Sequence, residues 1–512
     1  MIKENATKGI GKVIFSSSLG TLIEWYDFYI FGMLAKTIST QFFPEGNDTA
    51  ALLSTLAIFA AGFLVRPFGA LVFGRLGDLT GRKYTFLLTL VLMGGSTFLI
   101  GLIPSYKSIG IAAPLLVLLL RLVQGLALGG EYGGAATYVA EHAPAHRRGY
   151  FTAWIQTTAT LGLFVALGVI MCVKSNMSDS AFNAEWGGWR YPFWISILLV
   201  GVSIYIRLRM NESPVFAKLK SENKTSVNPL KESFGHKANF KMVLLALFGA
   251  VMGQGVIWYT GQFYAQSFLE NTCKLEFMQS RSILLWAIVF ATPFFLFFGW
   301  LSDKAGRKWI MLLGMLLGVI FYRPIFSVFL KDTNVKEWVK KEYSFIKEDQ
   351  KISMHGSDSI LQISTQYQTM DKLKFTTVIT DTLNNGGDTL QRIVQSNKNA
   401  VYINKELNKS GYIKFIFLTW LMIIFVTMVY GPVAAFLVEL FPTKIRYTSM
   451  SLPYHIGNGV FGGLVPFIAT LLSTTFTSDP LVGLWYPIGV AALCFVIGAL
   501  YLNNKKDKEL FD

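Results

Sequence analysis

Two copies of one turn, Gly74-Arg-Leu-Gly-Asp-Leu-Thr-Gly-Arg-Lys83 and Gly299-Trp-Leu-Ser-Asp-Lys-Ala-Gly-Arg-Lys308, divide the chain into two halves. The copies share glycine, leucine, aspartate, glycine, arginine and lysine in the same order, and each copy lies between two long apolar segments. A single Asp-x-x-Gly-Arg sequence is a common turn and helix-start pattern. Its recurrence at equivalent places predicts an internal duplication.

The composition places the chain in a membrane. It has 512 residues, of which 52% are hydrophobic and 15% are charged, whereas about a quarter of the residues of a soluble domain are charged. Apolar segments of about 20 residues or more, the length that crosses a bilayer as a helix, lie near residues 10–34, 50–73, 84–104, 112–140, 150–173, 191–209, 241–269, 281–301, 309–330, 412–440, 447–474 and 481–502. We therefore predict an all-α membrane protein with twelve transmembrane helices in two pseudo-symmetric six-helix bundles.

These segments divide the chain into four parts. We expect the N-terminal six-helix bundle at 1–209, a cytoplasmic linker at 210–240, the C-terminal bundle at 241–330 and 412–512, and an insertion at 331–411. The insertion is polar, its alternation over 372–380 and 394–403 indicates strands, and Asn384-Asn-Gly-Gly387 indicates a turn. A loop of this length predicts a small folded extracytoplasmic insertion between helices 9 and 10. The sequence indicates no role for it.

Basic residues set the orientation. The formal net charge is +15, and Lys and Arg concentrate in the linker and in the turns that follow even-numbered helices. By the positive-inside rule, both termini are cytoplasmic. The three cysteines, Cys172, Cys273 and Cys494, are widely scattered, so the sequence predicts neither a disulfide framework nor a metal site.

Charged residues inside predicted helices require an explanation, because a charge at the bilayer centre costs about 2.5–3.5 kcal/mol on insertion scales. Counting 1.5 Å per residue, Asp27 in helix 1 and Arg121 in helix 4 both lie about 7 Å on the outer side of the midplane. Arg66 and Glu131 both lie on the inner side, and Glu24 lies between the two layers. We expect Asp27 to pair with Arg121 and Arg66 to pair with Glu131. The alternative is that these are static pairs that hold helices together.

Three carboxylates against two arginines leave one negative charge in excess. A buried carboxylate without a full partner can take up a proton, so that the state of the site depends on protonation. The candidates for proton coupling are Asp27, Glu24 and Glu131. Which of them titrates is open at this point.

The second half contributes neutral hydrogen-bonding side chains in helices 7 and 11. They are Gln254, Trp258, Tyr259, Gln262, Tyr264, Tyr454, His455 and Asn458. A cavity with charge on one side and neutral polar groups on the other suits a small polar metabolite. The predicted substrate-binding residues are Arg121, Arg66, Gln254, Tyr259, Gln262, Tyr454 and Asn458. For each neutral side chain a hydrogen bond between packed helices is an equal alternative, and a lone His455 is more typical of a packed histidine.

The chain resembles the major facilitator superfamily and, within it, the metabolite:proton symporter family, which includes proline/betaine, ketoglutarate, citrate and shikimate carriers. The resembling stretches are Glu24-Trp-Tyr-Asp27-Phe, Val65-Arg-Pro-Phe-Gly69, the Gly74 turn, Arg121-Leu-Val-Gln-Gly125, Gly129-Gly-Glu-Tyr-Gly133, Arg147-Arg-Gly149, Gly188-Trp-Arg-Tyr-Pro-Phe193 and Glu439-Leu-Phe-Pro-Thr-Lys-Ile-Arg446. The resemblance covers nearly the whole chain except 331–411. It implies a central cavity that opens alternately to each side, and proton-coupled uptake across the inner membrane of a cell.

The resemblance also implies a gating role for the repeated turns. Asp78 and Asp303 would hold the inner gate closed by pairing with an arginine and with a helix N-terminus across the bundle, and an anion is favourable at such a terminus. Glycines in the turns permit tight turns and close backbone approach. The predicted gating residues are Gly74, Asp78, Gly81, Arg82, Gly299, Asp303, Gly306 and Arg307.

These patterns predict a secondary active transporter that takes up a small organic metabolite with protons by alternating access. One unpaired arginine favours a monocarboxylate or a zwitterionic solute such as proline or betaine, whereas a di- or tricarboxylate, which is the alternative, would need an excess of cations. An alternative of another class is a transporter-like membrane sensor that uses the 331–411 insertion. No nucleophile–base pair, phosphate loop or cofactor motif indicates an enzyme or a cofactor. The expected partners are a small-molecule substrate, protons and the lipid bilayer, without nucleic acid, and the protein is expected to be a monomer.

Overall fold

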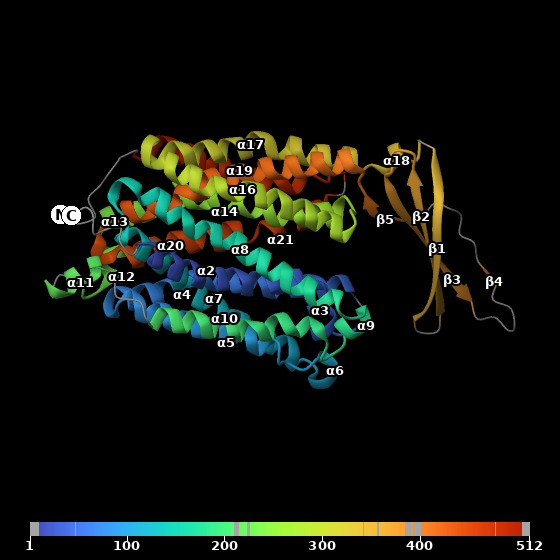
Figure 1. Ribbon diagram of the computed structural model, residues 1–512, viewed down its shortest axis with the longest axis horizontal. Helices are drawn as coiled ribbons and strands as arrows, with labels where there is room; N and C mark the ends of the chain where they lie inside the picture. Colours follow the sequence, from blue (N-terminus) through green and yellow to red (C-terminus); the bar gives the residue numbers. More distant parts are fainter. Residues whose placement is uncertain are drawn as a thin grey trace.

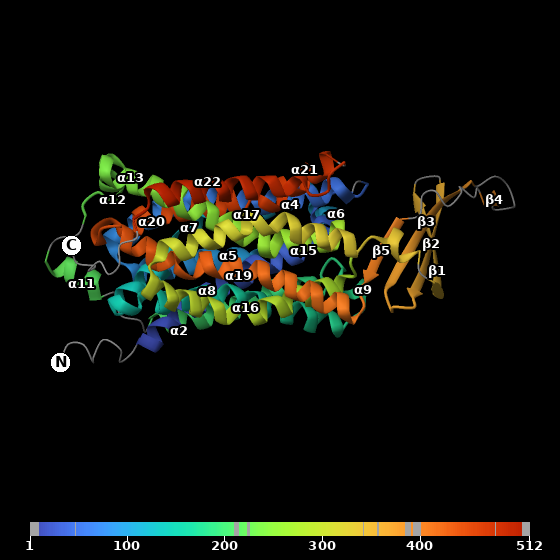
Figure 2. The same cartoon turned by 90° about the horizontal axis from the view of Figure 1, so that it is seen from above.

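The computed structural model describes residues 10–46, 48–208, 214–222, 226–340, 342–355, 358–384, 391–392, 401–476 and 478–503. Long helices run side by side in one bundle, and a β-sheet stands beyond one end of it (Figure 1). We call this end the sheet end. The opposite end carries α11 (Pro214–Ser221) and α12 (Pro229–Gly235), and α2 begins there, so we call it the linker end (Figure 2).

The first half of the bundle contains six long helices. They are α2 (Ile10–Met33), α4 (Asp48–Thr80), α5 (Arg82–Ile100), α7 (Ala112–His142), α8 (Arg148–Ser175) and α10 (Tyr191–Leu208). Short helices connect them: α3 (Ala35–Phe42), α6 (Tyr106–Ile109), η1 (Ala145–Arg147), α9 (Asp179–Phe182) and η2 (Gly188–Arg190).

The second half contains six helical rods, two of which are interrupted by π-helical turns. The first rod runs through α13 (Lys237–Ala246), η3 (Leu247–Val251), α14 (Met252–Tyr259), η4 (Thr260–Tyr264), α15 (Ala265–Ser267) and η5 (Phe268–Thr272). The others are α16 (Phe277–Ala305), α17 (Arg307–Asp332), α19 (Lys409–Leu440), the rod of α20 (Arg446–His455), η8 (Ile456–Gly462) and α21 (Val465–Thr475), and α22 (Trp485–Tyr501). Short helices α18 (Val335–Trp338), η7 (Thr443–Ile445) and η9 (Val482–Leu484) lie between them.

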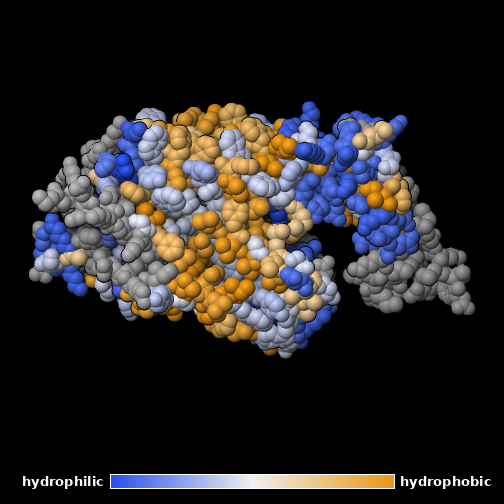
Figure 3. Space-filling view, in the orientation of Figure 1, coloured by the Kyte–Doolittle hydropathy of each residue, from blue (hydrophilic) through white to orange (hydrophobic). Residues whose placement is uncertain are grey.

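Ten of these helices, among the described residues, are long and apolar enough to cross a membrane. The other two long rods, α2 and α10, lie within the same bundle (Figure 1). Together they occupy the twelve apolar segments of the sequence. Large apolar side chains such as Phe68, Leu198 and Leu500 are 65–69% exposed on the outside of the bundle, and hydrophobic residues cover much of its middle on the face that Figure 3 shows. These exposed side chains are suited to contact lipid rather than water.

The duplication is visible in the backbone. Gly81 lies between α4 and α5 with φ of 120°, and Gly306 lies between α16 and α17 with φ of 94°. Both values belong to a region that favours glycine. The repeated turns therefore share a local conformation as well as a sequence pattern.

The insertion folds as an antiparallel sheet of five strands. They are β1 (Tyr343–His355), β2 (Asp358–Thr369), β3 (Lys374–Asn384), β4 (Gln391–Arg392) and β5 (Val401–Glu406), in the order β1-β2-β3-β4 with β5 also paired to β3. Strand β3 and residues 401–403 confirm parts of the predicted strands, whereas 394–400 and 385–387 lie outside the described residues. Asn384 ends β3, and the other residues of the predicted turn are not described, so the turn stays a prediction.

Strands β1 and β2 were not predicted from the sequence. The reason is that β1 is an edge strand that carries the polar run Lys347-Glu-Asp-Gln-Lys351, so it lacks the alternation of a half-buried strand. Charged residues are typical of edge strands because they oppose pairing with another chain.

Helices α4 and α7 approach so closely that their backbones touch. A Cβ atom added at Gly69 would lie 1.9 Å from the carbonyl oxygen of Leu126, and one added at Gly125 would lie 2.1 Å from that of Gly62. Small residues allow such close packing between membrane helices. This contact fixes Arg66 of α4 next to Arg121 of α7.

We predict that Gly69→Ala lowers the free energy of unfolding by about 1–3 kcal/mol, the usual cost of overpacking, because the new methyl group meets backbone atoms that cannot rotate away. Gly95→Ala in α5 is the matched control, since a Cβ atom there meets nothing within 4 Å. Thermal unfolding of both variants in detergent is the measurement. Equal midpoints for the two variants would contradict the prediction.

Candidate functional site

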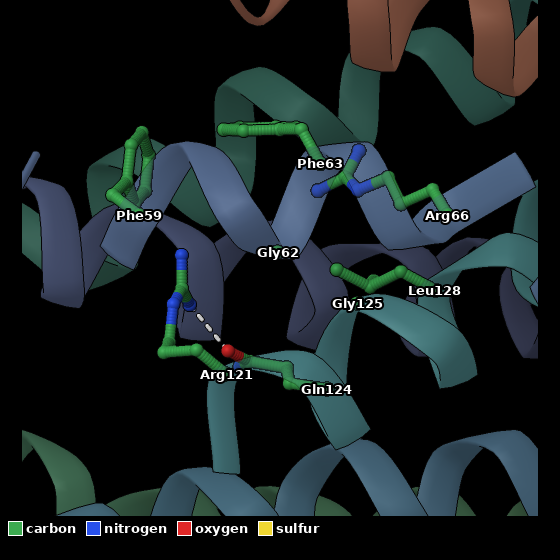
Figure 4. Close-up of a pocket in the computed structure, with 8 residues that line it drawn as sticks. All are labelled: Phe59, Gly62, Phe63, Arg66, Arg121, Gln124, Gly125 and Leu128. Atoms are coloured by element: carbon green, nitrogen blue, oxygen red, sulfur yellow. Dashed lines mark hydrogen bonds between the residues drawn. The ribbon is translucent and has the colours of Figure 1, made fainter. Parts of the chain in front are cut away.

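Two arginines line one small pocket in the first half. The pocket is a partly open space of about 160 Å³ between α4 and α7 (Figure 4). Its lining residues are Phe59, Gly62, Phe63, Arg66, Arg121, Gln124, Gly125 and Leu128. Both guanidinium groups therefore border the same space.

The guanidinium groups are held by aromatic rings and an amide. Arg66 is 6% exposed and lies 4.4 Å from the centroid of the Phe63 ring, and Arg121 is 4% exposed and lies 4.2 Å from that of Phe31. Such cation–π contacts stabilise a desolvated cation by about 2 kcal/mol. Arg121 donates to the amide oxygen of Gln124, and the Gln124 amide donates to Thr97 (2.8 Å). No described carboxylate lies within ion-pair distance of either arginine.

Asp27 is buried close to this pocket without a hydrogen bond. Its side chain is 1% exposed, and neither oxygen has a hydrogen-bond partner of good geometry among the described residues. Arg121 acts on it electrostatically, and the hydroxyl of Thr97 lies close to it. The sequence therefore correctly predicts that Asp27 lies near Arg121, but the two side chains do not form an ion pair in this structure.

The predicted contact between Arg66 and Glu131 is wrong. Glu131 accepts a hydrogen bond from the hydroxyl of Thr89 in α5 (2.9 Å), whereas Arg66 lies over Phe63 and Phe28. Counting along a helix gives the depth of a residue but not its direction around the helix axis. The two residues share a depth and face different neighbours.

Aromatic rings from both halves meet beside Glu24. We define the aromatic cluster as Trp25, Tyr132, Trp258, Tyr259, Tyr430 and Tyr454. The Tyr132 and Tyr454 rings are stacked with their centroids 3.5 Å apart, those of Trp25 and Trp258 lie 4.8 Å apart, and the hydroxyls of Tyr430 and Tyr454 are 2.8 Å apart.

Glu24 is 5% exposed and acts electrostatically on all four tyrosines of the aromatic cluster. Arg66 acts on Tyr259, and Phe63 packs edge-on against Tyr259 at 5.7 Å. The two-arginine pocket and the aromatic cluster are therefore contiguous. Tyr132 and Tyr430 were absent from the predicted site, because only contact across the two halves distinguishes a site tyrosine from one that packs a helix.

The remaining predicted residues of the second half divide between the site and packing. The side-chain amides of Gln254 and Asn458 satisfy each other through two hydrogen bonds of 3.1 and 2.7 Å, which is a packing contact between α14 and η8. Tyr259 and Tyr454 belong to the aromatic cluster. Gln262 is buried in η4, and His455 is buried, with no hydrogen bond of good geometry from either ring nitrogen to the residues that the structure describes.

Aromatic packing covers the site toward the sheet end. Phe263 of η4 is stacked on Tyr29 of α2 with 5.4 Å between the ring centroids, and it packs edge-on against Phe28 at 5.3 Å. Phe28 and Tyr29 are 2–3% exposed. The cover on this side consists of contacts between aromatic rings.

Reciprocal carboxylate caps close the bundle toward the linker end. Asp78 of the first repeat accepts bonds from the backbone N–H (2.9 Å) and hydroxyl (2.7 Å) of Thr448, in the first turn of α20. Asp303 of the second repeat accepts bonds of 2.8 Å from the N–H groups of Gly149 and Tyr150, in the first turn of α8. A carboxylate at a helix N-terminus satisfies otherwise unpaired N–H groups and the helix dipole.

Ion pairs reinforce these caps. Arg307 contacts Asp303 at 2.7 Å and Glu439 at 2.9 Å, and Glu439 also contacts Arg148 at 3.1 Å, across the two halves. Arg446 pairs with Glu141 at 3.1 Å. Glu439, Arg148, Glu141 and Arg446 were not predicted as gating residues, although three of them lie in the quoted family stretches.

The other predicted gating residues lie in the turns themselves. Gly74 packs against Thr448, and Gly299 packs against Gly149. Gly81 and Gly306 lie in the turns between helices, and Arg82 is the first residue of α5. The structure therefore brings the two repeats to the same end of the bundle, each against the opposite half. Their gating role stays a prediction.

A bundle of membrane-spanning helices in two halves, with a charged and aromatic centre between them, defines a multi-pass membrane transporter for a small molecule. The family model "Sugar (and other) transporter" matches residues 13–344. The chain belongs to this family, within the major facilitator superfamily, which confirms the resemblance, and membership makes it a transporter and not an enzyme. The match ends where β1 begins.

Similar proteins include bacterial transporters of several substrates. The chain is 31% identical to the inner membrane metabolite transport protein YhjE of Escherichia coli over 91% of this chain and 88% of that protein. It is 34% identical to the proline/betaine transporter of E. coli over 62% of this chain and 64% of that protein, and 28% identical to the E. coli alpha-ketoglutarate permease over 97% and 95%. The proton:xylose symporter XylE has the same fold, with a TM-score of 0.64 at 16% identity over 98% of both chains.

We predict that Asp303→Asn opens the linker end more often, because the neutral side chain loses its charge-assisted bonds to the N-terminus of α8 and to Arg307. The measurement is the labelling rate of a Ser451→Cys reporter, in a Cys172→Ser background, by a membrane-impermeant maleimide applied from the linker side. The rate should rise severalfold.

Asp479→Asn is the matched control. It breaks the ion pair between Asp479 and Arg323, and these two side chains are 35–38% exposed. Exposed ion pairs contribute at most about 1 kcal/mol to stability. An Asp303→Asn variant that labels at the same rate as this control would show that the Asp303 cap does not hold the gate.

Proposed function

We propose that this protein takes up a small zwitterionic solute of the proline or betaine type together with protons, by alternating access. The observation that carries the proposal is the two-arginine pocket beside a carboxylate-bearing aromatic cluster. One end of the site suits an anion and the other end suits a cation. The same proposal includes uptake across an inner membrane, with both termini cytoplasmic. It also includes the domain limits, which are 1–209, 210–240, 241–330 with 412–512, and 331–411.

The two-arginine pocket provides the anion end. Planar guanidinium groups bind a carboxylate through paired hydrogen bonds. Arg66 and Arg121 are buried, each has an Nε without a partner, and both line the pocket. Two buried cations without a close counter-ion are stabilised by a bound carboxylate.

The aromatic cluster provides the cation end. Its rings present negatively charged faces, which attract alkylated ammonium groups. Glu24 adds a negative charge in electrostatic contact with the four tyrosines. A solute whose carboxylate and ammonium groups are a few bonds apart reaches both ends, because Phe63 and Arg66 border both.

Asp27 is the residue that we propose carries the coupled proton. An ionised Asp27 attracts the nearby Arg121, whereas a protonated Asp27 leaves Arg121 to Gln124 and the pocket, which is the arrangement found here. Protonation of Asp27 thus leaves Arg121 available to bind the substrate carboxylate, and loss of that proton draws Arg121 away from the pocket toward Asp27. Occupancy by substrate and proton is thereby linked.

A dicarboxylate is a second candidate substrate, because two arginines in one pocket suit two carboxylate groups and the alpha-ketoglutarate permease is a relative. Glu24 in the neighbouring aromatic cluster opposes it by repulsion.

The substrate prediction is tested by thermal shift of the purified protein with glycine betaine, proline, choline, isobutyrate and α-ketoglutarate. We expect the zwitterions to raise the unfolding midpoint, by a stabilisation of about 2.7 kcal/mol at a hundredfold excess over Kd. Choline and isobutyrate each lack one end and should have much smaller effects. Stabilisation by α-ketoglutarate alone would favour the second candidate.

Arg66→Lys should weaken binding of the stabilising solute at least tenfold, which corresponds to about 1.4 kcal/mol, because a lysine cannot form the paired hydrogen bonds. Arg323→Lys, outside the site, is the control. Titration of the thermal shift against solute concentration gives both affinities. Unchanged affinity in Arg66→Lys would exclude a carboxylate bound by Arg66.

The coupling prediction concerns Asp27→Asn, which mimics the protonated residue. In proteoliposomes, exchange of labelled for unlabelled solute should persist, whereas accumulation driven by a proton gradient should be lost. Asp479→Asn should retain both activities. Proton-driven accumulation that survives in Asp27→Asn would exclude Asp27 as the coupling residue and direct the test to Glu24→Gln.

A further inference from the structure

The sheet is attached to the bundle where β5 runs beside the connection between η5 and α16. Leu275 and Lys405 pair in parallel. The N–H of Glu276 donates to the carbonyl of Lys405 (2.8 Å), and the N–H of Lys405 donates to the carbonyl of Lys274 (2.9 Å). Strand β5 thus continues its pairing onto the end of the rod Lys237–Thr272.

Side chains join two further helices to this attachment. The Gln279 amide in α16 donates to the carbonyl of Leu407 (2.9 Å) and accepts from its N–H (2.7 Å). The ammonium group of Lys405, 9% exposed, donates to the carbonyl of Thr333 at the end of α17 (2.8 Å). One short segment of the insertion therefore fixes η5, α16 and α17 to one another.

The backbone on both sides of the pair is held in an uncommon conformation. Lys274 has φ of 59° and Asn404 has φ of 47°, and each directly precedes one member of the pair. Residues other than glycine rarely adopt positive φ, and they persist there where surrounding contacts determine the backbone. The attachment is a specified contact and not the chance approach of a loop.

The same rod carries part of the aromatic cluster and the aromatic cover. Trp258 and Tyr259 end α14, Phe263 of η4 packs on Tyr29, and η5 begins five residues further on, at Phe268. π-Helical turns are often found at functional sites. Between the site and the sheet, the rod thus consists mainly of the π-helical turns η4 and η5, whose helical pitch can change. Strand β5 fixes the end of the rod that lies next to the sheet.

We propose that the extracytoplasmic sheet is a conformational clamp, which fixes the end of the rod Lys237–Thr272 to α16 and α17 and so holds Phe263 over the site. The proposal rests on the alternating access of the proposed function. Movement during the cycle then takes place in η4 and η5, while the attachment persists. Removing the attachment releases η5 and favours an open sheet end.

The test is a pair of spin labels at Thr40→Cys in α3 and Asn271→Cys in η5, in a Cys172→Ser background. Both sites are exposed at the sheet end, one in each half. Two anchor variants are compared with the parent: Gln279→Ala combined with Lys405→Ala, and replacement of 339–407 by a short Gly/Ser linker. Each should add a longer component to the distance distribution that pulsed electron spin resonance measures in proteoliposomes.

Lys374→Ala is the matched control, because it breaks the Lys374–Glu406 ion pair inside the sheet (2.8 Å) and leaves the attachment intact. Its distribution should equal that of the parent. Parent-like distributions in the anchor variants would overturn the proposal, and if the replacement variant does not fold, the double substitution alone decides.

The distance measurement needs no substrate, so it is independent of the proposed solute. A longer component in the anchor variants supports the clamp even where no tested solute is transported. If a zwitterion is transported and the distances between the spin labels are unchanged in the anchor variants, the proposed function is supported and the clamp is excluded.

Discussion

The energetic cost of a charge in the membrane is the constraint on which the centre of this protein depends. Asp27, Arg66 and Arg121 are buried within helices of the bundle, and none of them has an ion pair within 4 Å among the described residues. Aromatic faces and the Gln124 amide replace water around the arginines. Solvation of this kind leaves the cations able to bind an added anion, because no carboxylate of the protein must be displaced first. A closed ion pair would stabilise the bundle and leave no site.

The two ends of the bundle are closed by different kinds of interaction. At the linker end, Asp78 and Asp303 each accept two hydrogen bonds from a helix N-terminus of the other half, so opening this end breaks charge-assisted bonds in a discrete step. At the sheet end, Phe263 lies on Tyr29 and Phe28, and ring contacts change gradually as rings slide. In the alternating access that we propose, the linker end therefore supplies the all-or-none part of the conformational change, whereas the sheet end supplies a cover that adjusts to what is bound.

The sequence predicts the parts of this molecule that depend on length and depth. Twelve apolar segments, the repeated turns and the proximity of Asp27 to Arg121 all follow from counting along the chain, because a bilayer fixes the length of a helix. The Arg66–Glu131 contact is wrong because direction around a helix axis depends on packing, which here is set by the backbone contact at Gly69 and Leu126. Two tyrosines of the aromatic cluster are missed for a related reason. Tyr132 and Tyr430 come from different halves, and nothing local in the sequence brings two halves together.

The duplication is broken where the clamp attaches. In the first half, the connection equivalent to the sheet is the short stretch around α6, which is tied to the bundle by Glu185 through the backbone N–H of Ser105 (3.0 Å) and the hydroxyl of Ser108 (2.5 Å). These hydrogen bonds lower the pKa of Glu185 to about 2, so this tie stays ionised at any physiological pH. In the second half the connection is a sheet bonded to three helical elements. The axis that relates the two six-helix halves runs along the bundle, because both repeated turns lie at the linker end, so the two ends differ even where the halves are alike. The insertion is the largest element of the described chain that the first half does not repeat, and its contacts to η5, α16 and α17 act at the sheet end alone.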